Sequence, residues 1–177
     1  PAFVIQPTYD IMFGSPNAIT PLRYHTQHRQ FICVVSGKIR IKMTPWKSSK
    51  FLYPYKDLDM YEFRSPINAW KPQRKYFSDM DKVKFLEFDV SAGNMLYIPA
   101  YWWYSIQYGE EPDTVVAGCI YNNISNTLAN LPNLSLYLLQ QSNISIRPIK
   151  MNKQLAESDS PIELPNANND LSNNELT

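Results

Sequence analysis

Short apolar runs broken by Pro, Gly and Asn fill residues 8–123, and this pattern limits what the chain can fold into. The run at 38–43 alternates strictly, so Ile39, Ile41 and Met43 share one face of a strand. Runs this short and this often interrupted are typical of an all-β barrel or sandwich. The 177 residues are enough for one domain with a substantial core.

The same pattern sets the expected elements. It predicts strands near residues 9–14, 20–26, 29–36, 38–44, 84–90, 94–99, 102–108 and 114–122. The unbroken apolar run from Phe31 to Val35 predicts a strand buried on both faces. Towards the C-terminus, the leucines at 128, 131, 134, 138 and 139 recur at helical spacing, with Pro132 in the first turn or at a break.

These elements predict three parts. We expect a barrel over residues 1–126, a helical extension over 127–153 and an acidic, Asn-rich, flexible tail over 154–177. A long loop at 45–83 interrupts the barrel and is rich in aromatic residues and proline. Its candidate partner-binding residues are Tyr53, Tyr55, Tyr61, Phe63 and Trp70. The alternative is that the loop is a lid packed on its own barrel.

The distribution of charged residues indicates which classes of partner the chain can bind. Residues 1–153 hold all 17 Lys and Arg against 11 acids, a net charge of +6, and residues 154–177 carry −5. The bases form no stripe, so we expect no nucleic-acid binding. We find no signal peptide and no apolar run of membrane-spanning length, which favours an intracellular protein while leaving the location open. Cys33 and Cys119 are predicted to be buried thiols rather than a disulfide.

Two stretches carry a family resemblance. Residues 20–25 read Thr-Pro-Leu-Arg-Tyr-His, and residues 93–104 read Gly-Asn-Met-Leu-Tyr-Ile-Pro-Ala-Tyr-Trp-Trp-Tyr. Together with the hairpin at 31–38, they resemble the JmjC-type, cupin-like 2-oxoglutarate oxygenases, and among these the asparaginyl hydroxylases. The resemblance covers roughly residues 10–123. It implies a double-stranded β-helix, that is, a cupin or jelly-roll barrel.

The resemblance also implies where a metal would lie. Members of that family hold Fe(II) on two His and one carboxylate, a facial triad with open positions. Carried over by motif, the first His falls on Arg23, the carboxylate on His25 and the second His on Tyr104. Arginine keeps its proton and offers no lone pair. Tyrosine could ligate only as a phenolate, with a pKa near ~10. The resemblance thus implies a degenerate metal site.

The cosubstrate positions are altered as well. The family's lysine for 2-oxoglutarate falls on Ile39, and an asparagine of the last barrel strand falls on about Gly118. Thr20 is retained. Lys38 and Arg40 flank Ile39 but point to the opposite face of the strand. The joint loss of independent parts favours a protein without the family's chemistry.

We therefore predict a non-catalytic cupin-like module with no cofactor, which binds other proteins or serves a structural role in a large assembly. Fifteen Asn and 12 Tyr fit AT-rich coding, as in many large DNA viruses, so a virion component is one form of this prediction. Two alternatives stay open. One is an Fe(II)- and 2-oxoglutarate-dependent protein hydroxylase with an atypical metal site. The other is a metal-free binder of a small anion through Arg23 and His25.

Overall fold

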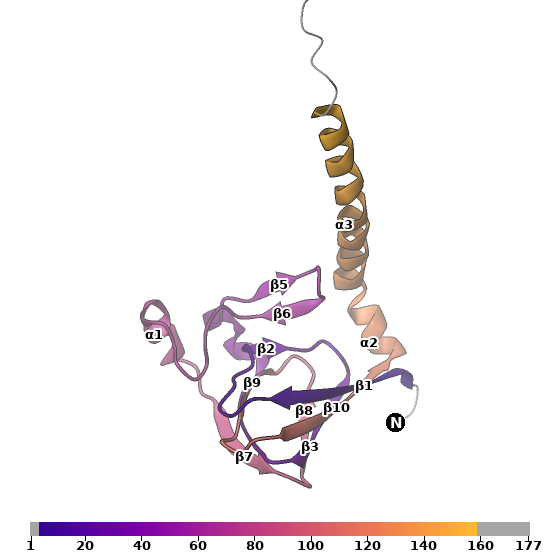
Figure 1. The fold of residues 1–177 in the computed structure, drawn as a ribbon. Coiled ribbons are helices and arrows are strands. Elements are labelled where there is room, and N and C mark those ends of the chain that lie inside the picture. The colour runs from indigo at the N-terminus through magenta and orange to yellow at the C-terminus, as the bar shows by residue number, and fades with distance from the viewer. Residues whose placement is uncertain (1–3, 159–177) are drawn as a thin grey trace, which may run out of the picture. The chain divides into compact units, whose positions relative to one another are not determined.

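The barrel consists of two antiparallel sheets that enclose one core. The structure, a computed structural model, describes residues 4–158. The first sheet has four strands, in the order β1 (Val4–Gly14), β10 (Thr114–Asn123), β3 (Arg29–Ser36) and β8 (Met95–Pro99). The second sheet has six strands, in the order β5 (Tyr55–Asp57), β6 (Glu62–Arg64), β2 (Arg23–Tyr24), β9 (Trp103–Tyr108), β4 (Lys38–Thr44) and β7 (Leu86–Ser91). Figure 1 shows β1 beside β10.

Alternation along β4 builds the core, as the sequence predicts. Ile39, Ile41 and Met43 are buried, while Lys38 and Arg40 face outward. From the opposing sheet, Ile32 and Val34 of β3 join the same buried cluster. Side chains of the two inner faces interdigitate, which is how a jelly roll fills its interior.

The predicted loop at 45–83 is only partly irregular. It contains two 3₁₀ turns, η1 (Trp46–Phe51) and η2 (Arg74–Tyr76), the short helix α1 (Phe77–Met80), and the hairpin of β5 and β6. The hairpin lacks an alternating apolar pattern, so the sequence missed both of its strands. It extends the second sheet, because β6 pairs with β2.

Two predictions about individual strands need correction. The strand expected at 20–26 is reduced to Arg23–Tyr24, because only these two residues form ladder pairs with both β6 and β9. Phe31–Val35 is buried on one face only: Ile32 and Val34 point inward, whereas Val35 is 58% exposed. No other described element of residues 4–140 covers the outer side of this strand. Cys33 and Cys119 are free thiols, and each is half-buried rather than fully buried.

The C-terminal extension is helical, with α2 (Ile124–Ala129) and α3 (Leu131–Ser158). The Asn123 side chain caps α2 by accepting a hydrogen bond from the Asn126 amide at 2.7 Å. Pro132 lies in the first turn of α3, one of the two predicted places. The helix continues five residues past the predicted end at 153, and the rest of the predicted tail, 159–177, lies outside the described residues. A first compact unit ends at Gln140, and the remainder of α3 belongs to a second.

Candidate functional site

The fold brings together the three positions that the motif alignment singles out. In the β2–β9 register, Arg23 lies opposite Tyr104. His25 follows β2, and its Nε2 shares a short hydrogen bond with the Tyr104 hydroxyl. Gln30 on β3 donates from Nε2 to the same hydroxyl at 3.2 Å. Tyr104 is thus the centre of a polar cluster inside the barrel, and Gln30 is a member that no motif indicated.

The charge of Arg23 is paired within this cluster. Its Nη1 lies 3.6 Å from Oε1 of Glu62, which is contributed by β6. The guanidinium carbon also lies 5.8 Å from the centroid of the Tyr104 ring. Glu62 in turn contacts Arg64, with Oε2 3.4 Å from Nε. The sequence missed Glu62 because its proximity depends on the pairing of β6 with β2, which no period in the sequence encodes.

The environment holds the cluster's ring side chains neutral. Burial, reinforced by the positive charge of Arg23, lowers the pKa of His25 to about 4. Burial raises the pKa of Tyr104, against the opposing effects of Arg23 and the Gln30 hydrogen bond. In the neutral tautomer with a free Nε2, the imidazole lone pair accepts the Tyr104 proton. His25 then has no free lone pair for a metal, and Arg23 never had one.

Apolar or backbone contacts occupy the cosubstrate positions. Ile39 is fully buried in the core, opposite Tyr108. Gly118 lies within β10, paired with Asp10 of β1. Thr20 is committed to the barrel frame, since its Oγ1 accepts from the Ile106 amide at 2.9 Å. None of these three positions presents a cation to a carboxylate ligand.

The Tyr-Trp-Trp motif holds the His25 segment in place. Tyr101 adopts a left-handed backbone with φ of 60°, which is unusual for a large side chain. Its amide donates to the His25 carbonyl at 2.9 Å, and its hydroxyl donates to Asn130 Oδ1 at 3.1 Å. Buried Asn130 donates to the Thr26 carbonyl at 3.2 Å. The start of the C-terminal extension therefore helps to position His25.

The predicted aromatic partner surface divides into two halves. Phe63 is buried in a core cluster with Trp103, and Trp70 donates from Nε1 to the buried Ser105 hydroxyl at 2.9 Å. Tyr61 is half-buried. These three residues pack the loop onto the barrel as a lid, so the surface prediction is wrong for Phe63. Tyr53 and Tyr55 remain exposed.

His25 should make stability depend on pH. Its pKa is depressed in the folded protein, so the unfolded chain binds the proton more readily between the ordinary value of 6.5 and about 4. The free energy of unfolding should therefore be retained well above pH 6.5 and fall as the pH drops towards 4, by about 3 kcal/mol. Urea titrations at stepped pH measure this slope.

Two variants separate the contribution of His25 to this pH dependence from that of the carboxylates that titrate in the same range. His25→Gln should flatten the slope between pH 6.5 and 4.5, whereas His28→Gln, outside the cluster, should leave it as in the wild type. Equal slopes in the wild type and His25→Gln would contradict the buried, neutral imidazole.

Two packed sheets with a motif-bearing polar cluster inside define a cupin-type β-barrel. The family model for the cupin-like domain matches residues 6–126, and the chain belongs to that family. The predicted all-β, jelly-roll fold with a C-terminal helix is thereby confirmed.

Several relatives of the chain are named for a JmjC domain or as lysine-specific demethylases. It is 29% identical over 94 residues to JmjC domain-containing protein D of Dictyostelium discoideum, covering 53% of this chain and 21% of that protein. It is 28% identical over 95 residues to lysine-specific demethylase JMJ30 of Arabidopsis thaliana, covering 54% and 22%. The chain thus spans about a fifth of the length of these relatives. Among solved structures, the Drosophila melanogaster CENP-C cupin domain matches at 14% identity and a TM-score of 0.40, covering 64% of this chain and 59% of that one.

Among the residues whose side chains the structure describes, no group of three or more His, Cys, Asp and Glu is arranged to hold a metal ion. None of the described helices has both the length and the apolar character needed to cross a bilayer.

Proposed function

We propose that this chain is a non-catalytic cupin-like module that acts by binding protein, in an interaction or assembly role. The observation behind the proposal is the cluster at the three metal-ligand positions. Arg23 is paired with Glu62, and Nε2 of His25 shares a short hydrogen bond with the Tyr104 hydroxyl. The facial triad of the Fe(II) oxygenases consists of two neutral imidazoles and a carboxylate, all with free lone pairs. The residues present do not fit that ion.

The exposed apolar surface of the barrel supports protein binding as its function. Tyr53, Tyr55 and a set of large apolar side chains on β1, β3 and β8 are exposed. Contiguous apolar surface of this kind marks interaction sites in folded domains. Some relatives are named as lysine demethylases, which is consistent with descent of this barrel from an enzyme. The side chains at the three metal-ligand positions argue against the same chemistry in this chain.

A metal titration tests the proposal. We expect anaerobic calorimetry of the wild type with Fe(II) to give no more binding heat than His25→Ala, which removes the imidazole from the cluster. We also expect no succinate from 2-oxoglutarate above the level of that variant. Stoichiometric Fe(II) binding that His25→Ala abolishes would instead support the alternative, a hydroxylase with an atypical metal site.

Buried polar atoms favour a second candidate function. Nε of Arg23 and Oε1 of Gln30 are buried without a hydrogen-bond partner in the structure. A small ligand with both an acceptor and a donor, such as a protonated carboxylic acid or an amide, could satisfy both. If the barrel binds one, small carboxylates and amides should raise the melting temperature of the wild type but not of Arg23→Met. Equal shifts in both proteins would exclude this site.

A further inference from the structure

The outer face of the four-stranded sheet is apolar, and no other described element of the first compact unit covers it. Large side chains project from it on three strands. Those more than a third exposed are Tyr9, Ile11, Phe13, Val35, Met95 and Tyr97. Between them lie smaller or half-buried residues of β3 and β10, namely Phe31, Cys33, Val115, Ala117, Cys119 and Tyr121. We call these twelve residues the outer apolar face.

The strand register makes this face continuous. Cys119 lies opposite Tyr9 on one side and Phe31 on the other, and Phe31 lies opposite Tyr97. This row crosses all four strands, and the row two residues along, centred on Ala117, does the same. Directly opposed side chains in a sheet lie about 5 Å apart, so the rows form a single surface.

The second sheet has the opposite character. On the outer side of β4 and β7, Lys38 lies 2.7 Å from Asp89, and Arg40 lies 2.6 Å from Glu87. That surface is a ladder of paired charges, as expected of a sheet facing water. The two outer faces of one barrel therefore differ, and only the first lacks charges at its centre.

The outer apolar face is larger than the apolar patch that a monomeric protein usually exposes. Its six exposed side chains together present on the order of 800 Å² of mostly apolar surface. The largest apolar patch on a typical monomer is about 300–600 Å². About 800 Å² is also what each partner contributes to a standard protein–protein interface. The area is thus what one stable contact needs.

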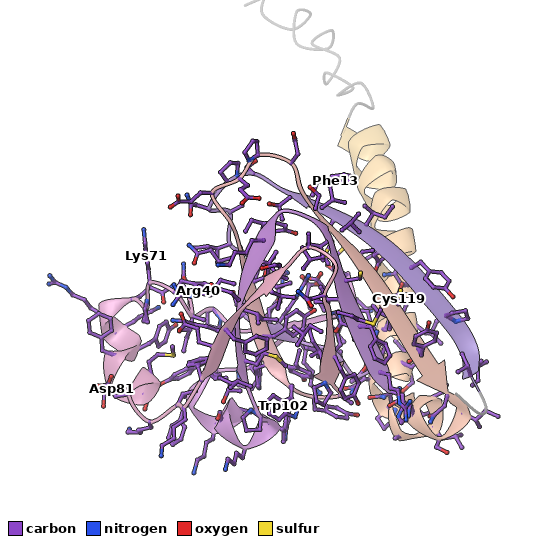
Figure 2. The ribbon with its side chains drawn as sticks, turned by 90° about the horizontal axis from the view of Figure 1, so that it is seen from below. Phe13, Arg40, Lys71, Asp81, Trp102 and Cys119 are labelled. Carbon is purple, nitrogen blue, oxygen red and sulfur yellow. The ribbon has the colours of Figure 1, made fainter. Side chains whose placement is uncertain are left out.

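The face carries both a protrusion and a hollow. Phe13, near the end of β1, is 75% exposed. A hollow of about 260 Å³ is lined by Arg29, Phe31, Met95, Cys119 and Tyr121. Phe13 lies opposite Val115, four residues along β10 from Cys119, which separates protrusion and hollow by about 13 Å. Figure 2 labels Phe13 and Cys119 on the neighbouring strands β1 and β10.

We propose that the outer apolar face binds a second copy of this chain, with the two sheets stacked across a two-fold axis. In a contact with two-fold symmetry, if residue i of one copy touches residue j of the other, then residue j of the first copy touches residue i of the second. A protrusion on the face must therefore be matched by a hollow on the same face. Phe13 of each copy enters the other's hollow, where Arg29 can stack on the ring. A charged face would repel its own image, and this face has charge only at the Arg29 rim.

Mass measurement across concentration tests the dimer. The full chain should change from monomer to dimer in sedimentation equilibrium, and Phe13→Asp should raise the dissociation constant at least about 30-fold. Met60→Asp is the matched control, because Met60 is equally exposed at 72% but lies in the β5–β6 hairpin. It should dimerise like the wild type.

A second readout places the contact on the hollow. Cys119 should react with a maleimide at least about tenfold more slowly in the wild-type dimer than in Phe13→Asp at the same protein concentration. A wild type that stays monomeric at all concentrations would overturn the proposal, as would a dimer unaffected by Phe13→Asp. The dimer contact does not involve the metal-ligand positions. If the chain dimerises and also binds Fe(II), the dimer stands and only the proposed non-catalytic function is refuted.

Discussion

Replacing Trp103 with alanine should lower the free energy of unfolding by about 3–5 kcal/mol, the cost of emptying a large buried site. The ring is fully buried and packs edge-on against Tyr24 at 4.7 Å between centroids. Its Nε1 donates to the buried Ser49 hydroxyl at 2.6 Å, so truncation also leaves that hydroxyl short of a partner. Chemical denaturation monitored by circular dichroism measures the loss.

Trp46→Ala is the control for this change. Trp46 stacks on Trp103 with ring centroids 6.4 Å apart, yet it is 47% exposed. Its truncation removes a similar volume at the surface and should cost under about 2 kcal/mol. If both variants lost the same free energy, Trp103 would not be the anchor of the core cluster that it shares with Phe63.

Local pattern predicted most of the barrel. The alternation at 38–43 identified the inward face of β4. This follows from the two-residue period of a strand, which depends on neighbours in sequence. The β5–β6 hairpin was missed for the same reason: it owes its place to pairing with β2 and has no apolar period of its own.

The sequence predicted only those site residues that belong to a recognisable motif. The motif alignment identified Arg23, His25 and Tyr104, and the structure brings these together. Glu62 and Gln30 enter through strand register, which depends on the whole fold. The outer apolar face was missed because an apolar run from Phe31 to Val35 looks the same whether one side of its strand is covered or both.

Rebuilding the facial triad should create metal affinity. In Arg23→His, His25→Asp, Tyr104→His, two imidazoles and a carboxylate replace a guanidinium, a hydrogen-bonded imidazole and a phenol. Since β2 and β9 hold positions 23 and 104 opposite each other, the new ligands should converge. We expect Fe(II), Co(II) or Zn(II) to bind at least about 100-fold more tightly than to the wild type, or about 2.7 kcal/mol.

Glu62 has a further consequence for this variant. It now pairs with Arg23 at 3.6 Å, and in the rebuilt site it could accept from the new imidazole at that position. Glu62→Gln in the triple variant should therefore weaken metal binding by about tenfold. A smaller effect would mean that the new imidazole lies away from β6.

Cosubstrate turnover should not follow from the metal alone. Ile39 is fully buried and offers no charge to the carboxylate of 2-oxoglutarate, so the triple variant should bind metal and still turn over poorly. Adding Ile39→Lys should then strengthen 2-oxoglutarate binding, provided that the buried ammonium does not unfold the barrel, which circular dichroism checks. Calorimetry of the wild type, triple and quadruple variants orders these steps. If the wild type bound Fe(II) as tightly as the triple variant, the three positions would not be the metal-ligand positions, and the non-catalytic function would be wrong.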